Sequence, residues 1–134
     1  MYLSDSEKNL TLDDMKKFNE FYNNKLPESF QDFYLKNNGG FPLNYKDGNI
    51  FMLGGFTPVK YGKRPIEKVY QDLVEAFDQL RDMLPFAYDY GGNAFLLSLK
   101  ANNSFGKIFV FLMDEKEIEF ISDSFTEFLE ELFS

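Results

Sequence analysis

The sequence predicts an α+β fold in a single domain over residues 1–134, with a mostly antiparallel sheet of about four to six strands packed against helices. Three observations lead to this prediction. Apolar residues recur at helical spacing near the start of the chain and again between residues 66 and 84. The last third consists of short apolar segments separated by turn residues. A further helical pattern then closes the chain, with no linker or internal repeat before it.

Two helices are expected at the start of the chain. Thr11, followed three residues later by Asp14, matches a capping box, and apolar residues at helical spacing extend the helix from about residue 12 to 23. Pro27 suits the first turn of a second helix. Its end is indicated by Gly39-Gly40, which we interpret as a C-terminal cap in a left-handed conformation.

The middle of the chain predicts a strand, a loop and a long helix. Residues 49–53 are short, apolar and framed by glycines, which favours a strand. Residues 57–65 are basic and are expected to form an exposed loop. From Ile66 to Leu84, apolar residues recur every three or four positions, so we expect a long amphipathic helix that Pro85 ends.

The last third predicts antiparallel strands followed by a helix. The strands are expected at residues 86–90, 93–99, 107–113 and 117–122, because turn-prone residues separate them. Residues 109–112 are apolar at every position, so this strand should be covered on both faces or lie centrally. Ser124 and Glu127 form a second capping-box pattern before a short helix with one apolar face.

Composition excludes several kinds of chemistry. The chain has no cysteine and no histidine, so disulfides, thiolate nucleophiles, His-assisted serine catalysis and imidazole metal sites are all impossible. A carboxylate-based hydrolase is the enzyme class that stays open, and no nucleophile motif supports it. We therefore expect a protein that is not an enzyme and that needs no cofactor or metal.

Charge and hydropathy narrow the range of partners. The formal net charge of -8 argues against nucleic-acid binding, which needs Lys and Arg on the binding face, and it permits a basic protein partner. The chain shows no apolar run of signal-peptide or membrane-spanning length. We expect a cytoplasmic, soluble protein that does not contact a membrane. The acidic residues are concentrated from residue 114 onward.

The pair Gly91-Gly92 lies between two aromatic-rich strand segments. A phosphate-binding loop, a strand-joining turn and a surface that receives another protein are the alternatives, and no phosphate-loop pattern occurs in the chain. We interpret the pair as a turn that also presents a contact surface, since tyrosine is a common anchor of interfaces. The candidate partner-binding residues here are Tyr88, Asp89, Tyr90, Gly91, Gly92 and Asn93.

A second candidate surface is the acidic run over residues 114–119. It is either a solvated hairpin or an acidic surface that meets a basic partner, and complementary charge would then speed association. Catalysis would require two carboxylates at a set distance, one of them in an apolar pocket, and nothing in the sequence indicates such a pocket. The candidate partner-binding residues are Asp114, Glu115, Glu117 and Glu119.

Three segments in this order resemble the SUKH superfamily, which includes the yeast cell-wall-synthesis regulator and many bacterial immunity proteins. They are residues 26–40 (LPESFQDFYLKNNGG), residues 86–99 (PFAYDYGGNAFLLSL when Pro85 is included) and residues 121–129 (ISDSFTEFL). The resemblance implies a non-catalytic α+β domain that binds and neutralises a cognate protein toxin. A nuclease is one class of toxin that fits this role. It also leaves open an interaction scaffold in cell-wall or envelope regulation.

Overall fold

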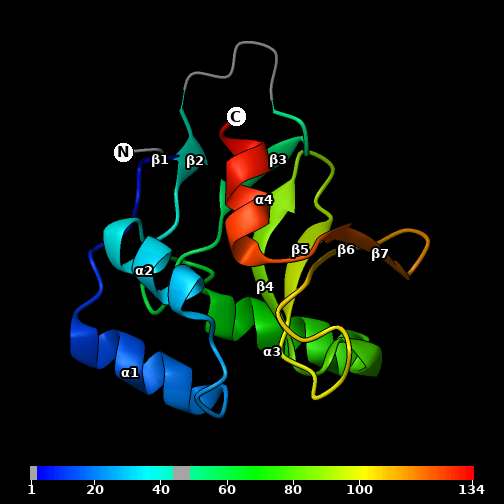
Figure 1. The fold of residues 1–134 in the computed structure, drawn as a ribbon, viewed down its shortest axis with the longest axis horizontal. Coiled ribbons are helices and arrows are strands. Elements are labelled where there is room, and N and C mark those ends of the chain that lie inside the picture. Colours follow the sequence, from blue (N-terminus) through cyan, green and yellow to red (C-terminus); the bar gives the residue numbers. More distant parts are fainter. Residues whose placement is uncertain (1–2, 44–48) are drawn as a thin grey trace.

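Five antiparallel strands in the order β3-β4-β5-β6-β7 form the main sheet (Figure 1). The structure is a computed structural model that describes residues 3–43 and 49–134. It confirms the α+β fold, and each strand of this sheet lies beside its neighbour in the sequence. The strands span Leu53–Phe56 (β3), Met83–Asp89 (β4), Ala94–Ser98 (β5), Ile108–Leu112 (β6) and Glu117–Ser122 (β7).

A second, two-stranded sheet lies at the N-terminal side of the molecule. Its strands β1 (Leu3–Ser4) and β2 (Phe41–Pro42) are antiparallel, and neither was expected from the sequence. Gly40 forms a bridge with Phe56, which connects this small sheet to β3. Strands of two residues carry no readable alternation of apolar and polar side chains, so only the three-dimensional fold reveals them.

Helices cover both faces of the main sheet. One apolar cluster joins the sheet to α1 (Leu12–Phe21), α2 (Glu28–Lys36) and α4 (Phe125–Leu132). A smaller cluster joins the opposite face to α3 (Ile66–Ala76) and to the short 3₁₀ helix η1 (Asp78–Leu80). Strand β6 contributes buried side chains to both clusters, which confirms that residues 109–112 are covered on both faces.

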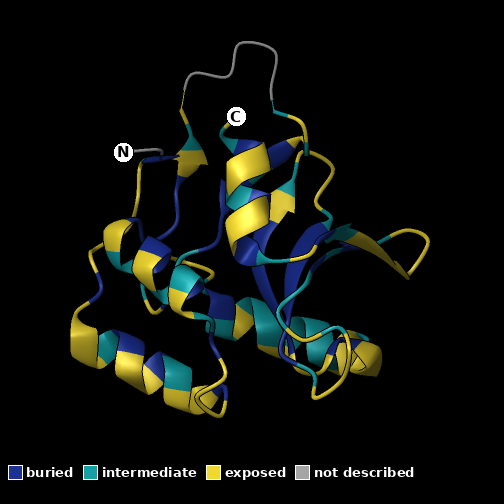
Figure 2. Ribbon diagram, in the orientation of Figure 1, coloured by how far each residue is buried: buried dark blue, intermediate teal, exposed yellow. Residues whose placement is uncertain are grey.

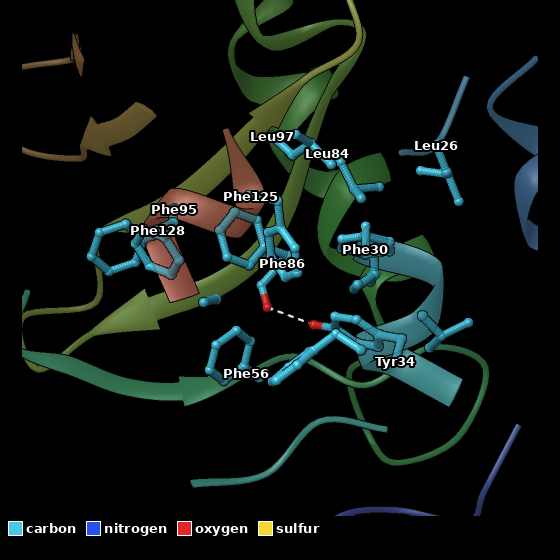
Figure 3. Packing of buried hydrophobic residues seen from close by; sticks show 14 of the residues in the cluster. Leu26, Phe30, Tyr34, Phe56, Leu84, Phe86, Phe95, Leu97, Phe125 and Phe128 are labelled. Carbon is cyan, nitrogen blue, oxygen red and sulfur yellow. Dashed lines mark hydrogen bonds between the residues drawn. The ribbon is translucent and has the colours of Figure 1, made fainter. Parts of the chain in front are cut away.

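Aromatic side chains fill the larger cluster (Figure 3). The Phe86 ring lies 5.3 Å from the Phe125 ring and 5.4 Å from the Phe128 ring, edge to face in both cases. The buried Tyr34 hydroxyl donates to the carbonyl oxygens of Thr57 and Phe86, at 2.7 and 2.9 Å. Each buried aromatic ring removes about 150–250 Å² from water. Helices α2 and α4 are therefore held to β4 by ring packing and by one bonded hydroxyl.

Two helix starts follow the predicted capping residues. Thr11 and Asp14 form the full capping box of α1, which is confirmed. At α4 the Ser124 side chain accepts from the Glu127 backbone N–H, but the structure shows no reciprocal bond from the Glu127 side chain, so the second capping box is only half present. One accepting side chain is enough to satisfy a free N–H at a helix start.

The predicted helix over residues 66–84 is too long. Helix α3 ends at Ala76, because the backbone of Phe77 is extended, and the 3₁₀ helix η1 follows it. Leu84 and Pro85 instead lie in β4, where Pro85 sits next to a register shift. A strand tolerates proline at such an irregularity, because a residue at a bulge does not have to donate an N–H to the ladder.

The predicted strand over residues 49–53 is displaced toward the C-terminus. Ile50 and Met52 are 71% and 61% exposed, and residues 47–48 of its predicted frame lie outside the described residues. The observed strand β3 begins at Leu53 and includes Gly54 and Gly55. Glycine suits both positions, because the Tyr88 side chain occupies the space that a Cβ would need.

Gly39 and Gly40 do not cap α2, which ends three residues earlier at Lys36. Both have positive φ, and both allow backbone segments to approach closely. A Cβ on Gly39 would lie 2.9 Å from the Pro58 backbone nitrogen, and one on Gly40 would collide with the Ser4 carbonyl oxygen. The interpretation as a helix cap was therefore wrong.

The segment 57–65 is only partly an exposed loop. Thr57 and Val59 are buried. The Asn38 side chain accepts from the Val59 backbone N–H at 2.7 Å and donates to the Val59 carbonyl oxygen at 3.0 Å. Lys60 pairs with Asp14 at 2.7 Å and Arg64 with Asp72 at 3.2 Å, so two of the three cations in this segment pair within the chain. No helix in the described ranges is long and apolar enough to cross a membrane.

Candidate partner-binding surface

The Gly91-Gly92 pair forms the turn between β4 and β5, which confirms its structural role. The Asp89 carboxylate organises this turn, accepting from the backbone N–H groups of Gly91 and Asn93 and from the Asn93 amide, all at 2.9–3.0 Å. Gly92 has φ +85°, a conformation that favours glycine. The turn is therefore rigid, because its own side chains satisfy its backbone.

Asn93 connects the two candidate segments. Its side-chain oxygen accepts from the Met113 backbone N–H at 2.9 Å, just before the acidic turn between β6 and β7. Because successive strands are antiparallel, the β4–β5 and β6–β7 turns lie at the same end of the sheet. The structure thus brings the segments 88–93 and 114–119 together, although nothing in the sequence predicted the bond between them.

The acidic segment is exposed, and its four carboxylates outnumber its one cation, Lys116. Residues 114–120 are all exposed. Within the described part of the chain, no ion pair neutralises the four candidate carboxylates, whereas Asp14, Asp72 and Asp123 each pair with a lysine or arginine. Unpaired, exposed carboxylates produce a negative potential that attracts a basic surface. The four are Asp114, Glu115, Glu117 and Glu119.

The two tyrosines of the first candidate segment differ in their surroundings. Tyr90 is 64% exposed, and Tyr88 is 38% exposed. The Tyr88 ring lies against the β3 glycines: a Cβ on Gly54 would be 3.2 Å from this ring, and one on Gly55 would collide with the Tyr88 hydroxyl. Partial burial raises the pKa of Tyr88 above its usual value. The sequence analysis did not predict this contact, although the pair Gly54-Gly55 was a visible signal for a close approach at this point.

A groove of about 390 Å³ lies beside this turn, between α3 and the sheet. Its lining is mainly apolar and includes Leu73 from α3, Phe77 just after that helix, Ala94 and Met113. Tyr88 lies at its boundary and also lines a neighbouring hollow of about 300 Å³. At the rim, Asp72 accepts from Arg64 and Lys68, each at 3.2 Å, which lowers the pKa of its carboxyl group.

A second hollow, of about 240 Å³, contains the two carboxylates of Asp14 and Glu67. Both are engaged by Lys60: its ammonium group contacts Asp14 at 2.7 Å, and its backbone N–H donates to Glu67 at 3.1 Å. The pKa of Asp14 falls to about 2, the opposite of what a general acid at neutral pH needs. Across residues 3–43 and 49–134, no three acidic side chains gather closely enough to hold a metal ion.

The fold and the surface together define an α+β protein whose candidate site is an exposed face with two hydrogen-bonded turns. A family comparison then gives its relationship. The model of the SMI1 / KNR4 family (SUKH-1) matches residues 9–131, and the chain belongs to this family. This confirms the resemblance found in the sequence. No curated protein matches the chain significantly.

Proposed function

We propose that the protein is an immunity protein, which binds a cognate toxin and blocks it without catalysis. The observation that carries the proposal is the family match, because the superfamily that the sequence resembles includes many bacterial immunity proteins. The exposed acidic segment 114–119 supports it further, because a toxin that acts on nucleic acid needs a basic face to bind phosphates.

The surface favours inhibition by occlusion. The turns at residues 90–93 and 113–116 are fixed by hydrogen bonds before any partner arrives, so little ordering cost opposes binding. Tyr88 and Tyr90 offer aromatic anchors beside the acidic residues. A Kd near 1 nM corresponds to about -12 kcal/mol, which a few such anchors with a complementary charged rim can supply.

The proposal includes the absence of catalysis, of a cofactor and of nucleic-acid or membrane partners, and a cytoplasmic location. The carboxylates of Asp14 and Glu67 are held by Lys60, so they do not form an acid and base pair facing a free pocket. The net charge of -8 disfavours contact with phosphate backbones.

The test is co-expression with the protein encoded by the adjacent gene, which this proposal requires to be a toxin. We expect the chain to restore growth, and we expect a tight complex in a pull-down. The quadruple charge reversal D114K/E115K/E117K/E119K should weaken that complex at least tenfold and flatten its dependence on salt. Cell death in the presence of soluble, folded protein would contradict the proposal.

A control variant tests whether charge reversal at other exposed carboxylates also weakens the complex. The variant E20K/D32K reverses two exposed carboxylates on α1 and α2, away from the β6–β7 hairpin (Figure 1). It should neutralise the toxin as well as the wild type does. Unchanged affinity after the quadruple reversal would place the interface elsewhere on the molecule.

A second candidate function is an interaction scaffold in cell-wall or envelope regulation. It is favoured by the yeast regulator in the superfamily that the sequence resembles, and the family match includes that branch by its description. The neighbouring gene distinguishes the two: a toxin gene supports immunity, and an envelope-synthesis gene supports the scaffold.

A further inference from the structure

Strand β7 is the free edge of the five-stranded sheet. It pairs with β6 on one side, and no described strand pairs with its other side. The β6–β7 hairpin extends away from the helices, and most of β7 is exposed (Figures 1 and 2). The backbone N–H and C=O groups along such an edge are able to pair with an incoming strand.

One side of β7 carries its acidic residues. Glu117 lies opposite Leu112 of β6, and Glu119 lies opposite Val110. Residues directly opposite in antiparallel strands point to the same face, so both glutamates project on the face that α4 covers further along the sheet. Both are exposed, and neither pairs with a cation within the described residues.

The other side of β7 is apolar. Ile118 lies opposite Phe111, and Phe120 lies opposite Phe109, with the Phe109 and Phe120 rings 5.9 Å apart. Phe111 and Phe109 belong to the cluster beneath α3. Ile118 is 37% exposed and Phe120 is 55% exposed, so the apolar face of the sheet continues to the edge, where the Lys107 ammonium group lies 5.8 Å from the centre of the Phe120 ring.

A second copy of the chain is a poor occupant for this edge. In a symmetric antiparallel pair, one residue lies at the centre and the residues equidistant from it face each other. When Glu117 or Glu119 is the central residue, its carboxylate faces the same residue of the other copy. When Ile118 is central, Glu117 of each copy faces Glu119 of the other. A centre one or two residues beyond Glu119 sets a glutamate against Asp123. Like charges directly opposite destabilise strand pairing in the first three cases, and in the last two the ion pair of Asp123 with Lys107 reduces this repulsion.

We propose that the partner pairs an extended segment with β7, and that this segment alternates basic with apolar residues. Its Lys or Arg side chains face Glu117 and Glu119, and its apolar side chains cover Ile118 and Phe120. The identity of the partner as a toxin rests on the proposed function; the chemistry of its docking segment follows from the two sides of this strand.

The test uses two short peptides with the isotopically labelled full chain. One peptide is acetyl-Lys-Val-Lys-Val-Lys-Thr-amide, and its matched control replaces each Lys with Glu. In an NMR titration, we expect the lysine peptide to shift the backbone amides of residues 117–122 and to bind at least tenfold more tightly than the glutamate peptide. The same amides should exchange more slowly with solvent, and added salt should reduce the difference between the peptides.

Two variants complete the test. The double reversal E117K/E119K should reverse the peptide preference, whereas E20K/D32K should retain it. Equal affinities, shifts confined to other elements, or a stable dimer in sedimentation would each overturn the proposal. Toxin neutralisation without peptide pairing at β7 would refute this docking mode alone. Peptide pairing without neutralisation would refute the toxin and leave the strand-binding edge in place.

Discussion

Single buried polar groups fix the positions of whole segments in this protein. The Tyr34 hydroxyl donates to Thr57 and Phe86 from the centre of the aromatic cluster. The Phe86 oxygen also accepts from the Thr57 backbone N–H at 2.8 Å, so the Thr57 oxygen is the one that depends most on Tyr34. A buried polar group without a partner costs more than the bond itself contributes.

The substitution Tyr34→Phe should therefore destabilise the fold by about 1–3 kcal/mol, because it leaves a buried carbonyl oxygen unpaired. Urea denaturation would measure this as a lower midpoint with an unchanged slope. Tyr90→Phe is the matched control, since that tyrosine is 64% exposed, and it should change the midpoint very little. Equal effects of the two substitutions would contradict the role given to the Tyr34 hydroxyl.

Asp14 makes part of the stability dependent on pH. Its bonds to the Lys60 ammonium group and the Thr11 backbone N–H lower its pKa from 3.8 to about 2. A carboxyl group whose pKa is lower in the folded state stabilises the fold above its unfolded value, and this stabilisation disappears as the pH falls through the folded value. Its contribution is thus present above about pH 4 and is lost toward pH 2.

The substitution Asp14→Asn removes this charge, and its effect should depend on pH. At pH 7 the variant should unfold at less urea than the wild type, and the gap should narrow between about pH 4 and pH 2. Asp13→Asn is the control: Asp13 pairs with Lys17 across exposed side chains, a kind of pair that contributes little. A gap that stays constant with pH would exclude the proposed linkage.

At the scale of elements, adjacent glycines have different tasks. Gly92 has positive φ with open space around it, whereas the backbone of Gly91 is not in that region. Gly92→Ala should therefore destabilise the protein by about 1 kcal/mol through backbone strain, and Gly91→Ala should stay within about 0.5 kcal/mol of the wild type. Thermal unfolding of the pair measures the difference. A larger effect at Gly91 would mean that the turn differs from the one described.

Element types were predictable where the local signal and the tertiary contacts agree. The Thr11 capping box marks the start of α1, and the turn at Gly91-Gly92 marks a hairpin, because both depend on neighbouring residues only. The end of α3 was not predictable, since Leu80 and Leu84 continue the helical spacing but pack instead in two different clusters around the sheet. The spacing of apolar residues alone does not distinguish a helix that continues from one that ends and is followed by a strand.

The residue types of the candidate surface could be read from the sequence. The contacts that bring its two segments together could not. Aromatic, glycine and acidic residues could be read from the sequence, but the bond from Met113 to Asn93 joins positions twenty residues apart. The groove beside Tyr88 depends on the packing of α3 on the sheet, which a linear pattern does not specify. The partner-binding role of these residues stays a prediction for the experiments described above.

At the scale of the whole molecule, an acidic hairpin projects from a frame packed with aromatic rings. The four hairpin carboxylates are exposed and form no ion pair within the described residues, so substitutions there should leave the packing of the frame unchanged.

The Asn93 side chain has a consequence for how binding data should be read. It holds both loops at one end of the sheet, accepting from one and donating within the other. Displacing either loop therefore disturbs its neighbour. The changes in binding free energy caused by substitutions in the two loops will be coupled and will not add. A loss of affinity after altering Asn93 would report a change in shape, even if no partner atom ever touches that amide.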